Sequence, residues 1–183
     1  MKKILLALSV VLALAGAAFA DNPNKDFDEG YVKLLDTHCI RTFVEGTPVG
    51  DEFIMGARGS IHFIYLSGTM SEMIAKSQEA PAWLTSANND MGFGKRGYEN
   101  FIIYLVANQP WVVEAEKFNI GGYHLKREDI LTRESWVPVG VNAQLADEWS
   151  FCVQVPRKYC KPGTEIEIGY DKYLEKFKVP TVK

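Results

Sequence analysis

Apolar and polar residues alternate with a period of two along much of the chain, the pattern of strands buried on one face. It is clearest over residues 164–170, where Ile166, Ile168 and Tyr170 alternate with glutamates and a glycine. Continuously apolar segments, such as residues 101–106, are typical of strands buried on both faces. Comparable strand-like segments cover residues 31–44, 61–66, 111–120, 136–141, 149–155 and 173–179. The pattern predicts about eight strands separated by turn residues.

Two local signals refine this pattern. Gly121 and Gly122 form a two-residue hairpin signal, which predicts that Ile120 faces Tyr123 across a tight turn. Thr69 and Glu72 fit a capping box ahead of apolar residues spaced for one helix face, and Pro81 ends the pattern. One short helix is therefore expected, over about residues 70–79.

Strand content and turn spacing favour a mainly β fold, an antiparallel sandwich-like single domain with this one helix. An α+β fold with an antiparallel sheet is the alternative. The domain is expected to span residues 31–183, preceded by a flexible acidic leader at residues 21–30.

The first twenty residues have the anatomy of a secretory signal peptide. Lys2 and Lys3 precede an apolar run, and Ala18-Phe19-Ala20 forms a small-x-small cleavage site. The alternative, a retained membrane anchor, is disfavoured because the apolar run is short. We therefore expect an exported protein, periplasmic or extracellular, whose mature chain begins at Asp21 and is not inserted in the membrane.

The charge of the mature chain excludes one class of partner. After removal of the signal, which contains Lys2 and Lys3, the chain keeps 18 basic and 23 acidic side chains, a net charge of −5. A mildly acidic chain without basic runs lacks the electrostatic footprint of nucleic-acid binding. The expected partner is a protein or glycan of the cell envelope.

Three cysteines, Cys39, Cys152 and Cys160, would meet an oxidising environment after export. Cys152 with Cys160 is the favoured disulfide candidate because these two residues are close in sequence. A bridge from Cys39 to either of them is the alternative, and each pairing leaves one thiol, expected to be buried and inert.

The segment Val153-Gln154-Val155-Pro156, followed by Lys161-Pro162-Gly163-Thr164 and the alternating residues 165–170, resembles a strand-crossover-strand pattern of bacterial immunoglobulin-like sandwich domains. The resemblance implies a fold only, and it carries over no catalytic or binding residue.

Residues 92–97 match the dinucleotide motif G-x-G-x-x-G, but no strand precedes them and no helix follows. No cofactor is therefore expected, and Lys95 and Arg96 remain as candidates for a weak anion contact. Neither H-E-x-x-H nor a pair of C-x-x-C motifs occurs, so no metal site is expected from local spacing. The copper alternative, His62 with Met70 and Met73, competes with core packing of the methionines.

Trp83 is the strongest candidate binding residue, because it follows Ala80-Pro81-Ala82 in a loop-like region where an aromatic ring stays exposed. No catalytic residues are assigned, since neither G-x-S-x-G nor S-x-x-K is present. The sequence thus favours a non-catalytic binding or protein-interaction module. A periplasmic carbohydrate- or metal-binding protein is the first alternative, and a small hydrolase the second.

Overall fold

The structure is a computed structural model that describes residues 24–45, 57–91, 96–107, 113–139 and 146–181. The signal peptide expected at residues 1–20 lies outside this range, as does Lys95. The helices are α2 (Lys25–His38), α3 (Gly68–Lys76) and α4 (Ala82–Asp90), with short 3₁₀ turns at Ala115–Lys117 and Arg127–Asp129.

Within the ranges that the structure describes, nine strands form two antiparallel sheets. The five-stranded sheet has the order β1-β2-β3-β7-β6, and the four-stranded sheet has the order β5-β4-β8-β9. The strands are β1 (Cys39–Glu45), β2 (Ala57–Tyr65), β3 (Tyr98–Ala107), β4 (Phe118–Ile120), β5 (Tyr123–His124), β6 (Ile130–Val139), β7 (Ala146–Pro156), β8 (Glu165–Tyr170) and β9 (Tyr173–Lys178). The prediction of a mainly β, antiparallel fold is confirmed, although the described part of the chain holds three α-helices where one was expected.

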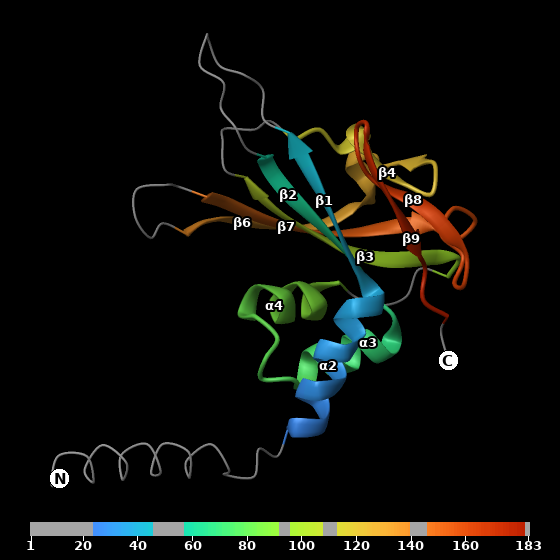
Figure 1. Cartoon of the computed structure of the whole chain (residues 1–183). Helices are drawn as coiled ribbons and strands as arrows, with labels where there is room; N and C mark the ends of the chain where they lie inside the picture. Colours follow the sequence, from blue (N-terminus) through green and yellow to red (C-terminus); the bar gives the residue numbers. More distant parts are fainter. Residues whose placement is uncertain (1–23, 46–56, 92–95, 108–112, 140–145, 182–183) are drawn as a thin grey trace, which may run out of the picture.

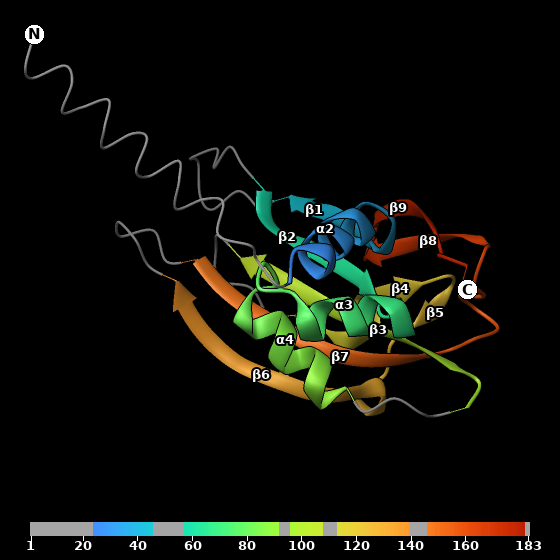
Figure 2. The ribbon, with the colours of Figure 1, turned by 90° about the horizontal axis from the view of Figure 1, so that it is seen from below.

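The elements are stacked in three layers. The three α-helices cover one face of the five-stranded sheet, and the four-stranded sheet packs on the other face (Figure 1). Seen from the helical side, the strands of the large sheet extend past the helices, so part of this face is not covered by them (Figure 2). The chain passes from one sheet to the other between β3 and β4, again between β5 and β6, and again between β7 and β8.

The central strands contribute to two separate cores because successive side chains point to opposite faces. On β3, Phe101 and Ile103 pack toward the four-stranded sheet, whereas Ile102 packs toward the helices. All three side chains are fully buried. This explains why residues 101–106 form an unbroken apolar run, as a strand covered on both faces requires.

α3 is the helix that the sequence predicts, with a different start. Its cap is Ser67, whose hydroxyl accepts a hydrogen bond from the Met70 amide at 3.1 Å. The helix therefore begins at Gly68 and ends at Lys76, so the expected cap at Thr69 and the extension to Glu79 were wrong. Met70 faces the core and is fully buried.

α2 replaces both the expected leader and the first half of the expected strand at residues 31–44. Residues 25–30 are its first turns, and its carboxylate at Asp28 is buried. Asp28 accepts hydrogen bonds from the Ser77 hydroxyl at 2.7 Å and the Gln78 amide at 2.6 Å, just beyond α3. These bonds fasten the start of α2 to the end of α3, so residues 25–30 of the expected leader are helical, while residues 21–23 lie outside the described part of the chain.

The Gly-Gly hairpin is confirmed, with Ile120 paired to Tyr123 across β4 and β5. Both glycines have positive φ, 64° at Gly121 and 85° at Gly122, as a type I′ turn requires. Gly121 also has no room for a side chain, because a Cβ there would lie 1.9 Å from the Tyr159 carbonyl oxygen.

The expected disulfide between Cys152 and Cys160 does not form in the structure, where all three cysteines are free. Cys152 points to the helical side, where its thiol donates to the Ala87 carbonyl at 3.2 Å. Cys160 belongs to the core on the other side of the sheet. Closeness in sequence was misleading because the five-stranded sheet separates the two sulfur atoms.

Candidate functional site

A pocket of about 510 Å³ opens between the helices and the helical face of the five-stranded sheet. Its size is within the usual range of small-molecule sites. Five elements contribute to it: α2, β1, β2, β3 and α4. The lining residues are Tyr31, Leu35, Asp36, Cys39, Arg41, His62, Ile64, Trp83, Leu84 and Tyr104.

The floor of the pocket is a row of three side chains on neighbouring strands. Arg41 of β1 is paired with His62 of β2, which is paired with Tyr104 of β3. Directly paired residues in antiparallel strands project from the same face of the sheet. The rings of His62 and Tyr104 are in contact, with centroids 5.7 Å apart. Strand register thus assembles a cation, an imidazole and a phenol from three distant parts of the chain.

Trp83 forms the wall of the pocket on the α4 side. It lies in the first turn of α4, and its indole stacks on the Tyr104 ring with centroids 4.1 Å apart and planes 10° from parallel. Its side chain is half-buried. The sequence placed Trp83 in a loop with an exposed ring, whereas the structure places it on a helix and uses the ring to line a cavity.

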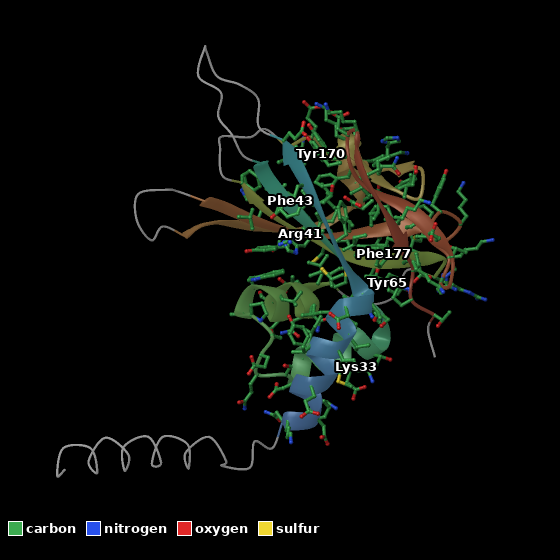
Figure 3. All side chains as sticks on the ribbon, viewed as in Figure 1. Lys33, Arg41, Phe43, Tyr65, Tyr170 and Phe177 are labelled. Carbon is green, nitrogen blue, oxygen red and sulfur yellow. The ribbon has the colours of Figure 1, made fainter. Side chains whose placement is uncertain are left out.

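Arg41 supplies positive charge at the outer end of the row. Its guanidinium lies 4.5 Å from the centroid of the Phe43 ring on the same strand, and Phe43 is farther along β1 from the helices (Figure 3). Both side chains are exposed. Among the residues whose side chains the structure describes, no carboxylate lies within 4.0 Å of this guanidinium. Arg41 is held in place by an aromatic ring and keeps its hydrogen-bonding edge for another group.

Burial and Arg41 set the protonation of the pocket. Burial, reinforced by the nearby Arg41 charge, lowers the pKa of His62 below its ordinary value of 6.5, so the imidazole is neutral at pH 7. Burial raises the pKa of the Cys39 thiol to about 11, although Arg41 opposes the shift. Burial also raises the pKa of Tyr31. At neutral pH the pocket therefore has a neutral thiol, which is neither a nucleophile nor a metal ligand.

A second groove, of about 800 Å³, lies on the other side of the junction between α2 and β1. Two continuous stretches line it, residues 36–40 and residues 176–181. Its ionisable and aromatic groups, among them His38, Lys176 and Phe177, come from these two chain segments alone, whereas five elements contribute side chains to the pocket at Trp83. The pocket at Trp83 is the better candidate for this reason.

His38 and Ser67 form the one pair that resembles catalytic machinery among the described residues. The Ser67 hydroxyl lies 3.0 Å from Nε2 of His38, whose Nδ1 lies 3.2 Å from the Leu34 carbonyl oxygen. Ser67 is 7% exposed and His38 is 6% exposed. Because Ser67 also caps α3, the pair joins the end of α2 to the start of α3, and its role is structural.

The other residues singled out from the sequence do not join this pocket. Arg96 is exposed and precedes β3, two residues before Tyr98. Tyr98 and Tyr104 are separated by six residues of the same strand, a span of about 20 Å. In the part of the chain that the structure describes, no three or more His, Cys, Asp or Glu side chains are grouped to hold a metal ion. Within the same part, no helix has the length and apolar character needed to cross a membrane.

Sequence reasoning named Trp83, considered His62 only as a copper ligand with Met70 and Met73, and missed Arg41 and Tyr104. Arg41, His62 and Tyr104 are far apart along the chain, and only the pairing of β1, β2 and β3 brings them together. One signal was available: His62 interrupts the apolar segment at residues 61–66, where a strand covered on both faces would carry another apolar residue.

Comparison with protein-family models, with curated proteins and with solved structures gave no match. The assignment of function therefore depends on the geometry of the pocket.

Proposed function

We propose that this chain is a non-catalytic binding domain of the cell envelope, exported by its signal peptide, and that the pocket at Trp83 holds its ligand. The observation that carries the proposal is the meeting of the stacked Trp83–Tyr104 pair with the Arg41–His62–Tyr104 row around one cavity. Ligand sites are typically concave, largely apolar and provided with a few convergent polar groups.

A binding role fits the chemistry of the pocket better than catalysis does. Its thiol is protonated at neutral pH, and its imidazole contacts an aromatic ring within the pocket. A nucleophile is activated by a neighbouring base, by a lowered pKa or by a metal, and the pKa of the Cys39 thiol is raised instead. The described pair in which a base lies within hydrogen-bond reach of a hydroxyl, His38 with Ser67, is buried between two helices.

The location follows from the sequence. The charged, apolar and small-residue sections of residues 1–20 are those of an export signal, and the acidic mature chain fits an envelope protein that does not bind nucleic acid. Such a domain would take a small molecule, a glycan unit or a side chain of a protein partner into the pocket.

Ligand-observed saturation-transfer NMR tests the proposal. The mature chain is offered N-acetylglucosamine, cellobiose, 2-naphthoate, 2-naphthamide and 2-naphthylmethylamine, which cover neutral sugars and flat rings of each charge. We expect at least one compound to bind saturably at millimolar concentration or below, and Trp83→Ala to abolish its binding.

Arg41→Gln is the second variant, because the exposed Arg41 can be changed without removing core contacts. Arg96→Gln is the matched control, since Arg96 is also exposed and lies before the start of β3, away from the pocket. Circular dichroism establishes that each variant is folded. The proposal is overturned if no compound binds, or if every compound binds Trp83→Ala as well as it binds the natural chain.

A further inference from the structure

We infer that the ligand of this pocket is an organic anion with a flat apolar body, whose anionic group binds Arg41 and whose body lies against the Trp83–Tyr104 wall. The inference depends on the proposed function and adds the ligand class to it. Three features of the pocket support it.

The first feature is the charge balance. The pocket is lined by one carboxylate, that of Asp36, and by one guanidinium, that of Arg41. The charged atoms of these two side chains are more than 4.0 Å apart. Asp36 belongs to α2, whereas Arg41 is on β1, in the row that forms the floor. An anion on the floor therefore meets the cation directly, without displacing an internal ion pair.

The second feature is the way Arg41 is held. A guanidinium placed against an aromatic face, as Arg41 is against Phe43, keeps its in-plane N–H donors for a planar acceptor. Carboxylates match this fork with two parallel hydrogen bonds, which are stronger than neutral ones. The held geometry also lowers the side-chain entropy lost when a ligand binds.

The third feature is the shape and polarity of the wall. The indole of Trp83 is stacked face to face on the ring of Tyr104, so the two rings form one aromatic block, and the side chains of Tyr31, Ile64 and Leu84 add apolar groups to the lining. A flat hydrocarbon body gains contact area here. A compact inorganic anion would leave this surface in water, which is why we assign an organic anion rather than phosphate or sulfate.

Direct titration of 2-naphthoate against 2-naphthamide tests the inference, because the two probes share one ring and differ in charge. The readout is the indole N–H signal of Trp83 in ¹H–¹⁵N spectra, assigned by its loss in Trp83→Phe. We expect 2-naphthoate to bind about tenfold more tightly, the effect of one charged hydrogen-bonded pair. Arg41→Gln should remove this preference while leaving the affinity for 2-naphthamide within about twofold, and Arg96→Gln should change neither affinity.

Each other result is decisive. Equal affinities for the two naphthalene probes, or a preference that survives in Arg41→Gln, overturn the anion assignment and leave the binding function standing. If a sugar binds and neither naphthalene probe binds, the anion assignment is also overturned and the binding function stands. If none of the five probes in the saturation-transfer experiment binds, both the anion assignment and the proposed function are wrong.

Discussion

His38 and His62 are two imidazoles that folding removes from water. Burial lowers the pKa of each below the ordinary value of 6.5, with Arg41 adding to the effect at His62 and the Leu34 carbonyl opposing it at His38. A group whose pKa is lower in the folded chain binds fewer protons there than in the unfolded chain, so acid favours unfolding. The contribution is fully present above about pH 6.5 and is lost as the pH falls from there toward the folded pKa values.

We therefore predict that the free energy of unfolding decreases between pH 7 and 5.5, by at most about 1.4 kcal/mol per pH unit for each histidine. Urea titrations at several pH values measure this slope. His62→Gln should reduce it, because one of the two titrating groups is removed. His124→Gln is the control, since His124 is exposed, and a slope that is the same in all three chains would contradict the prediction.

At this scale the sequence could identify single residues but not their neighbours. Trp83 could be singled out as a candidate binding residue because it follows Ala80-Pro81-Ala82 in a segment that resembles a loop. Arg41 and His62 become partners only through the register of β1 against β2, and a shift of one residue would place one of them on the opposite face. No local pattern in the chain specifies that register.

Among the elements, strands were easier to predict than helices. β8 and β9 follow clear apolar alternation or compact apolar runs, and the described structure contains both nearly as expected. α2 and α4 were missed because their sequences are polar and rich in residues that favour turns. The first two turns of α2 contain Asp26, Asp28 and Gly30, and α4 ends with Asn88, Asn89 and Asp90. Both helices depend on packing against the sheet rather than on intrinsic propensity.

α3 allows a test of how its first turn is capped. We predict that Ser67→Ala destabilises the protein by about 1–2 kcal/mol, because the Met70 amide loses its acceptor and His38 loses a buried hydrogen-bond partner. Thr69→Ala, two residues on, should change stability by less than about 0.5 kcal/mol, since Thr69 is exposed. Urea denaturation of both variants decides between the two caps, and the reverse order would restore the capping box expected from the sequence.

At the scale of the whole molecule, the position of the large sheet controls the chemistry of the cysteines. Cys152 and Cys160 lie in different cores, and burial raises the pKa of Cys160 to about 12. Cys39 is also protonated at neutral pH. The fold therefore keeps Cys152 apart from Cys160, and the buried, protonated thiols of Cys39 and Cys160 are poorly reactive, even in an oxidising compartment.

We predict three free thiols in each chain purified without reductant. Alkylation with iodoacetamide should be slow in the native protein and should add three groups after denaturation, as counted by mass spectrometry. A single added group after denaturation would show that one disulfide forms and would contradict the prediction of three free thiols. Alkylation after reduction is the control, because it gives the full count of three in either case.

The mainly β, antiparallel character was predictable because it depends on the apolar pattern of many residues at once. The number of layers was not predictable, because a continuously apolar strand indicates that both of its faces are covered but not which elements cover them. The helices on one side and the small sheet on the other use the same strands, β2, β3 and β7. If either outer layer detached, apolar side chains of all three strands would be left facing water. Loss of one layer alone is therefore costly, and this arrangement favours a single cooperative transition in which both outer layers and the shared strands unfold together.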